Sequence, residues 1–124
     1  MAGHSKPKAR PFVKMQGAGN DFILFDCLKH TFQNPPHLAR KLCNRHFGVG
    51  GDGMILLLKS SKQDFAMRIF NADGSEAEMC GNGIRCLVRY IKDAGISVKK
   101  ELSIDTPAGP RKVKHVGKLI EVDM

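Results

Sequence analysis

The segment from residue 82 to residue 94 is the part of the sequence that most constrains the fold. It predicts a helix that ends at Gly95, the kind of residue that commonly follows a helix C-terminus. Its apolar residues lie around most of the helix circumference: Ile84, Cys86, Leu87, Val88, Tyr90, Ile91 and Ala94. A helix that is apolar on most sides must be covered by other elements. We therefore expect this helix to be the central element of the domain.

Short apolar segments separated by turn residues predict strands on both sides of this helix. We expect strands at residues 12–15, 22–26, 54–59, 64–70, 101–105, 111–116 and 118–122. A second helix is expected from residue 34 to about residue 46, because Pro35 and Pro36 suit a first helical turn. The fold class predicted is α+β, with a mixed, mostly antiparallel sheet curled around one central helix.

The charge of the chain is basic but shows no pattern of nucleic-acid recognition. Lys and Arg number 20 against 12 Asp and Glu, which gives a net charge of +8. One Tyr and no Trp leave little aromatic surface on which bases stack. We interpret the excess as a solvated basic surface that attracts anionic ligands, and we expect no nucleic-acid partner.

The N-terminal residues 1–11 are polar and basic, so we expect a disordered basic extension or a remnant of cloning. They contain no apolar stretch typical of a secretory signal. No apolar run approaches the roughly 20 residues that span a bilayer, so no membrane partner is expected. Four cysteines without such a signal indicate reduced thiols and a cytoplasmic location.

Cys80 is the most informative single residue, because it lies in the turn Cys80-Gly81-Asn82-Gly83 directly ahead of the central helix. Free backbone N–H groups and the positive end of the helix dipole gather at such a position. They favour a thiolate and can hold a carboxylate. A buried structural thiol is the alternative, and the acidic residues Glu76 and Glu78 would oppose ionisation if they face the sulfur. We interpret Cys80 as a reactive thiol.

A second pattern, Cys27-x-x-His30 with Cys43-x-x-His46, contains the ligand set of tetrahedral zinc. It would make the chain a basic zinc-binding or nucleic-acid-binding module. Against this, Cys43 and His46 lie inside a predicted helix, and the chain has enough apolar residues for a core without a metal. We therefore expect no metal site.

Four stretches together carry a resemblance to a known family: MQGAGNDF at 15–22, NRHFGVGGDG at 44–53, RIFNADGSEAEMCGNGIRC at 68–86 and TPAG at 106–109. The longest of them closely resembles the signature of diaminopimelate epimerase. The resemblance implies that residues 12–124 form the N-terminal domain of such an enzyme. It also implies that a second, C-terminal domain is absent from this chain.

The family consists of cofactor-independent isomerases of lysine and peptidoglycan precursor biosynthesis, which interconvert LL- and meso-2,6-diaminopimelate. The resemblance implies two similar domains with the substrate between them, each supplying one cysteine to a two-thiol proton transfer. Cys80 is implied as one catalytic cysteine, and Gly81 and Asn82 as donors to the α-carboxylate. Asn20 and Asn71 are implied as contacts of the polar ends of the substrate. Some relatives have glutamine where Gly53 stands, so a side-chain contact is missing there.

The other cysteines lie outside a second Cys-Gly-x-Gly context, so we expect the isolated chain to be inactive. The partners expected are diaminopimelate and the missing C-terminal domain or its separate chain. The apolar surface that this domain would cover also makes a homodimer an expectation. The alternative function is another cofactor-independent amino-acid racemase of the same fold.

Overall fold

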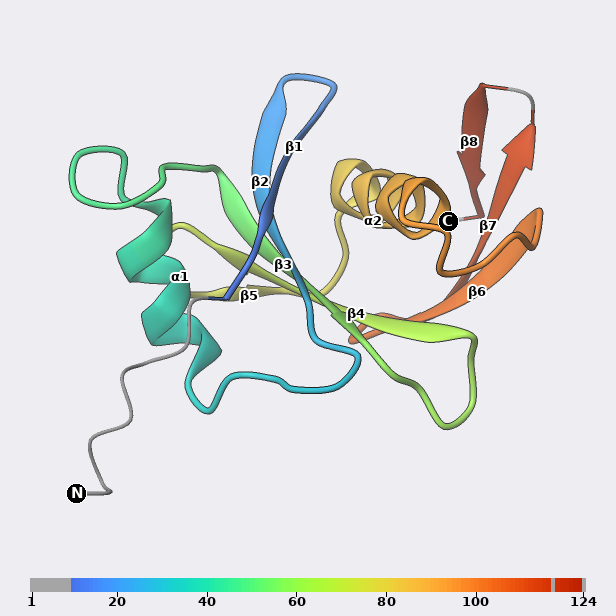
Figure 1. Ribbon diagram of the computed structural model, residues 1–124, viewed down its shortest axis with the longest axis horizontal. Helices are drawn as coiled ribbons and strands as arrows, with labels where there is room; N and C mark the ends of the chain where they lie inside the picture. The colour runs from blue at the N-terminus through green and yellow to red at the C-terminus, as the bar shows by residue number, and fades with distance from the viewer. Residues whose placement is uncertain (1–9, 117, 124) are drawn as a thin grey trace.

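The computed structural model describes residues 10–116 and 118–123, so most of the expected extension, residues 1–9, lies outside the described residues. The described residues form two helices and one eight-stranded sheet (Figure 1). In chain order the elements are β1 (Val13–Gly17), β2 (Asn20–Asp26), α1 (Pro35–Cys43), β3 (Gly53–Leu58), β4 (Phe65–Asn71), β5 (Glu76–Ala77), α2 (Gly81–Asp93), β6 (Glu101–Thr106), β7 (Gly109–Val116) and β8 (Leu119–Val122).

The sheet is mixed and mostly antiparallel, as the sequence predicts. The strands lie in the order β1-β2-β3-β4-β6-β7-β8, with the short β5 paired to β4. Only β2–β3 and β4–β6 are parallel among the pairings of the described residues. A helix lies between the two strands of each parallel pair in the chain, α1 in the first and α2 in the second. Parallel neighbours need such a crossover, whereas antiparallel neighbours are joined by tight turns.

The middle strands bury side chains on both faces of the sheet, which explains their unbroken apolar runs. One core packs against α2, and its strand residues include Phe22, Leu24, Ile55, Leu57, Met67 and Ile69. The other packs against α1 and includes Ile23, Phe25, Met54, Leu56 and Phe70. Because alternate residues of one strand point to opposite faces, β2, β3 and β4 contribute to both cores.

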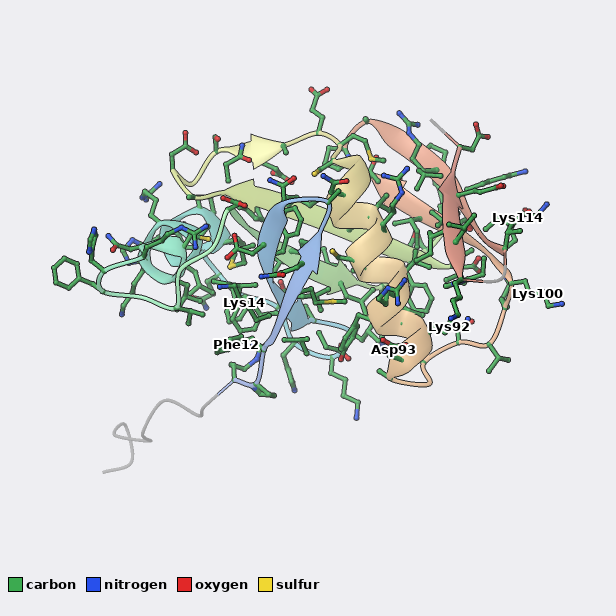
Figure 2. All side chains as sticks on the ribbon, turned by 90° about the horizontal axis from the view of Figure 1, so that it is seen from above. Phe12, Lys14, Lys92, Asp93, Lys100 and Lys114 are labelled. Atoms are coloured by element: carbon green, nitrogen blue, oxygen red, sulfur yellow. The ribbon has the colours of Figure 1, made fainter. Side chains whose placement is uncertain are left out.

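Helix α2 occupies the concave side of the curled sheet, which confirms the predicted central helix. It contacts β1, β2, β3, β4 and β8, and so reaches both edges of the sheet. In Figure 2, α2 lies between β1, marked by Lys14, and the end of the sheet that carries Lys114. Helix α1 packs on the opposite face, against β3 and β4.

The structure corrects two details of the helices. Helix α1 ends at Cys43 rather than near residue 46, because the Asn44 backbone is extended and its side chain accepts hydrogen bonds from the N–H groups of His46 and Phe47. Helix α2 is not apolar all round: its exposed stripe carries Arg85, Arg89 and Lys92. Neither helix of the described residues is long and apolar enough to cross a bilayer.

Candidate functional site

Cys80 is the N-cap residue of α2, the position that the sequence predicts for it. Its backbone is extended, with φ −147° and ψ 113°, and its carbonyl accepts the N–H of Ile84 at 2.9 Å. Its Sγ accepts the N–H of Gly83 at 3.4 Å. Every described cysteine is free, but Cys80 is half-buried while the other three are at most 5% exposed. Cys80 therefore offers the most accessible thiol of the described residues.

The N–H groups of Gly81 and Asn82 lie in the first turn of α2. Neither donates a hydrogen bond to any acceptor in residues 10–116 and 118–123. Unpaired first-turn N–H groups together with the helix dipole form a ready site for an anion. The start of α2 therefore combines a thiol with two free donors on consecutive residues.

Gly83 is required because the first turn of α2 lies tightly on β4. A Cβ atom at this position would come within 2.4 Å of Ile69 Cδ1, whereas one at Gly81 would meet only Arg85 Nη1 at 3.4 Å. The two glycines of this turn therefore have different roles. Gly83 allows close packing, and Gly81 leaves the backbone uncovered.

The tip of the β1–β2 hairpin packs against the start of α2. Ala18 and Gly19 form its two-residue turn with φ values of 49° and 92°, the positive pair that a type I′ turn requires. A Cβ atom at Gly17 would come within 3.0 Å of Cys86 Sγ, so the tip fits closely. This packing lets Asn82 Nδ2 donate to Asn20 Oδ1 at 2.8 Å, in a partly buried position. Two of the expected substrate-binding residues therefore meet.

Asn71 lies at the end of β4, opposite Gly53 on β3. Its Nδ2 donates to Ser75 Oγ at 3.0 Å, and its backbone N–H donates to the Ser75 carbonyl at 2.7 Å. Within the described parts of the chain, no hydrogen bond joins it to Cys80, Asn20 or Asn82. Asn71 nevertheless lies at the same end of the sheet as Asn20, because Gly53 pairs with Asn71 on one side and with Phe22 on the other.

Sequence reasoning missed a cluster of charged residues behind Asn20. Arg45 donates to both carboxylate oxygens of Asp21, at 2.8 and 3.2 Å, and to Asp52 Oδ1 at 3.2 Å. Lys14 Nζ lies 3.1 Å from Asp21 Oδ2. Hydrogen bonds from Arg45 hold the pKa of Asp21 well below its usual range, with Lys14 and Asp52 contributing. Arg45, Asp21 and Asp52 all lie in the family-like stretches, which is the one signal that pointed to them.

Two hollows flank the hairpin tip. One, of about 500 Å³, lies between β1, α2 and β8 and includes Arg85 and Arg89. The other, of about 390 Å³, is lined by Gln16, Gly19, Asn20, Asp21, Arg45 and Asp52. In the second hollow Arg45 is already paired with the carboxylates of Asp21 and Asp52. The first hollow, which also includes Lys118, is the one whose charge suits an anionic ligand.

The remaining cysteines belong to the cores. Cys86 lies on α2 at 3% exposure, and burial raises the pKa of its thiol, with a smaller contribution from Cys80. Burial likewise raises the pKa of Cys27 and of Cys43.

The zinc alternative is not supported by the positions of its four residues. Cys27 and Cys43 are buried in the core on the α1 side, whereas His30 and His46 are exposed. Over residues 10–116 and 118–123, no three His, Cys, Asp or Glu side chains are placed to hold a metal ion. Cys27 Sγ instead accepts a hydrogen bond from Arg10 Nη2 at 3.6 Å.

Known proteins are similar to this chain in structure or in sequence. One structural neighbour is a probable proline racemase from Agrobacterium radiobacter K84, with a TM-score of 0.71 and 16% sequence identity; the match covers 91% of this chain and 41% of that one. Another is a PhzF-family phenazine biosynthesis protein from Bacillus anthracis, with a TM-score of 0.66 and 24% sequence identity; this match covers 90% of this chain and 36% of that one. At these identities the likeness shows the fold alone.

Closer relatives are found by sequence. A diaminopimelate epimerase of Acetivibrio thermocellus is 46% identical over an alignment of 118 positions that covers 91% of this chain and 42% of the relative. One of Desulfitobacterium hafniense is 55% identical over an alignment of 100 positions that covers 78% of this chain and 35% of the relative. The chain thus spans about two-fifths of the length of such relatives. The profile of the diaminopimelate epimerase family matches residues 12–124. On this match, the chain belongs to the diaminopimelate epimerase family.

Proposed function

We propose that residues 12–124 form the N-terminal domain of a diaminopimelate epimerase, and that Cys80 is one of the two thiols that exchange the α-proton of the substrate. One observation carries the proposal. A half-buried thiol caps α2 immediately before the two unpaired N–H groups of Gly81 and Asn82. In this proposal the N–H groups hold the α-carboxylate and place the α-carbon beside the sulfur.

The chemistry explains why donors and thiol belong together. Removing the α-proton spreads negative charge from the α-carbon onto the carboxylate. Fixed N–H donors at a helix start stabilise that charge as it develops, without reorganising. One thiolate takes the proton from one face while a thiol delivers a proton to the other, so the two sulfurs exchange protonation states and the configuration inverts.

The second thiol is proposed to come from the part of the protein that corresponds to the remaining length of the relatives, as a C-terminal domain or a separate chain. Cys27, Cys43 and Cys86 are at most 5% exposed and belong to the two cores, so none of them is proposed as the second thiol. With one accessible thiol, a removed proton returns to the face that it left. The isolated chain is therefore expected to leave diaminopimelate unconverted, and a cytoplasmic location is part of the same proposal.

Asn20 and Asn71 are proposed to contact the polar ends of the substrate. Asn20 lies beside the start of α2 through its hydrogen bond with Asn82, so it fits a contact close to the α-carbon. Asn71 lies at the end of β4, two strands from β2, and is proposed to contact the distal end of a long substrate.

A fused protein tests the proposal. Residues 12–123 are joined to the unmatched C-terminal part of the A. thermocellus relative, and conversion of LL- to meso-diaminopimelate is measured. The fusion should convert it, residues 12–123 alone should not, and Cys80→Ser should lower kcat by about 10²–10⁴-fold, because the proton-transfer group is lost.

Cys43→Ala is the matched control, since this thiol lies in the other core. Conversion by residues 12–123 alone that requires Cys80 would overturn the expected inactivity. A fusion that keeps its rate with Cys80→Ser would overturn the role of Cys80. L-Proline and trans-4-hydroxy-L-proline in the same assay separate the alternative racemase function, because a fusion that turns over these and not diaminopimelate supports that alternative.

A further inference from the structure

Asp52 is linked by a hydrogen bond to Asn20, which is itself hydrogen-bonded to Asn82. Its Oδ2 accepts from Asn20 Nδ2 at 3.4 Å and from the N–H of Asp21 at 3.0 Å, while its Oδ1 accepts from Arg45 Nη2 at 3.2 Å. Asn20 Oδ1 in turn accepts from Asn82 Nδ2 at 2.8 Å. A continuous series of polar contacts therefore runs from Arg45 to the first turn of α2.

The position of the Asp52 carboxylate is itself fixed. Its backbone N–H donates to the Asp21 carbonyl at 2.8 Å and to Asp21 Oδ1 at 3.1 Å. Backbone bonds and the shared Arg45 guanidinium thus hold residue 52 beside the start of β2. The carboxylate presents a fixed acceptor to Asn20 rather than following it.

The Asp52 carboxylate determines which of its two orientations the Asn20 amide adopts. The two ends of an asparagine amide have nearly the same shape, but one end accepts hydrogen bonds and the other donates them. A carboxylate only accepts, so it favours the orientation in which Asn20 turns Nδ2 toward Asp52. In that orientation Oδ1 faces Asn82. The opposite orientation would set an oxygen against the Asp52 carboxylate, and Asn82 would have to turn its own amide to keep a hydrogen bond with Asn20.

We propose that Asp52 is a positioning residue that fixes the amide orientation of Asn20, and through it the side chain of Asn82 at the start of α2. The effect of Asp52 on the orientation of Asn20 and Asn82 does not depend on the proposed function. Its catalytic consequence rests on the proposed function, because the first turn of α2 would hold the α-carboxylate. The loss of fixed orientation at such a position lowers catalysis without touching the thiol.

The first test is an NMR measurement on the 124-residue chain. In the unchanged protein, one side-chain amide proton of Asn82 should be shifted downfield and exchange slowly with solvent. In Asp52→Asn, the new amide can offer Asn20 either a donor or an acceptor. The Asn82 signal should therefore lose its protection or split into two sets.

Asp64→Asn is the matched control for a merely structural carboxylate. Asp64 also accepts a backbone N–H, that of Ser103 at 2.9 Å, and pairs with a cation, Lys99, at 2.8 Å. This change should lower stability while leaving the Asn82 signal unchanged. If Asp64→Asn alters the Asn82 signal as much as Asp52→Asn does, or if Asp52→Asn leaves it unaltered, the proposal is wrong.

Exchanging the carboxylate and the amide between positions 20 and 52 should restore the Asn82 signal. In the double variant Asn20→Asp with Asp52→Asn, residue 20 carries a carboxylate that accepts from Asn82 whichever way it turns. The second oxygen accepts from the new amide at position 52. The protected Asn82 signal should return in the double variant, including in the event that Asp52→Asn alone does not fold. A double variant that folds without this signal would contradict the proposal.

The activity measurement separates this proposal from the proposed function. In the fused enzyme, Asp52→Asn should lower kcat/KM by roughly 10 to 100-fold, mostly in kcat, because the charge on the carboxylate is greatest in the transition state. A fusion without epimerase activity counts against the proposed function and leaves the NMR result standing. An active fusion with kcat unchanged by Asp52→Asn counts against the catalytic role of Asp52 alone.

Discussion

The side chains of Asn20 and Asn82 are 62 positions apart in the sequence and share a hydrogen bond of 2.8 Å. Asn20 begins β2, and Asn82 is the second residue of α2. The bond therefore ties the edge hairpin of the sheet to the end of the central helix that carries Cys80. Its formation depends on the tight β1–β2 turn and on the close packing of that turn against α2.

The strength of this contact can be measured with a double-mutant cycle. Asn20→Ala and Asn82→Ala should each lower the free energy of unfolding, because each leaves a partly buried polar group without its partner. The coupling energy from urea denaturation of the two single variants and the double variant should be about 1 kcal/mol. Strictly additive effects would show that the bond contributes nothing to stability.

Selective labelling should identify Cys80 by its accessibility. Limited treatment of the folded chain with iodoacetamide at neutral pH should modify Cys80 first, because the other three thiols are buried. Peptide mass spectrometry locates the label. In Cys80→Ser the folded chain should stay largely unmodified until denaturant exposes the cores. Equal labelling of Cys86 in the folded protein would contradict the described packing of α2.

Alanine substitutions at Gly83 and Gly81 should have different effects on the free energy of unfolding, because only Gly83 lies tightly against β4. Gly83→Ala should destabilise the chain by about 1–3 kcal/mol, because the new Cβ overpacks against the buried Ile69 side chain. Gly81→Ala meets only a flexible arginine and should be neutral or stabilising by about 0.5–1 kcal/mol. Ile69→Val removes the atom nearest to the new Cβ. Combined with Gly83→Ala it should cost less than the sum of the two single changes, as thermal or urea denaturation would show.

Periodicity and turn residues were enough to predict the main elements. The apolar circumference of residues 84–91 indicated a central helix, and that helix lies inside the curl of the sheet. The pairing of strands did not follow from the same patterns. Short strands such as β5, of two residues, carry no period at all, and the end of α1 depends on the Asn44 side chain bonding its own loop.

The candidate site was predictable to the extent that it is local. Cys80, Gly81 and Asn82 are adjacent in the sequence, so an N-terminal helix turn and its donors could be expected together. The contact of Asn20 with Asn82 and the ionic cluster around Arg45 join distant segments. A single sequence shows the charges of Asp21 and Asp52 but not which cation lies between them.

The ionic cluster also predicts how stability changes with pH. Hydrogen bonds from Arg45, with Lys14, hold the native pKa of Asp21 below its value in the unfolded chain, which is about 3.9. The unfolded chain therefore binds a proton more readily than the folded chain does. The contribution of Asp21 to stability is fully present above about pH 5 and is lost progressively as the pH falls through the unfolded pKa toward the lower native pKa.

Urea denaturation across the acid range measures this loss. Asp21→Asn should lower stability at neutral pH and reduce the decline of stability between about pH 5 and pH 2, because the titrating group is gone. Arg45→Met should have a similar effect, since Arg45 is the largest cause of the lowered pKa. Lys62→Met removes one positive charge from the turn between β3 and β4 and should leave the decline unchanged. A decline in Asp21→Asn as steep as in the unchanged protein would mean that this cluster does not link protonation to folding.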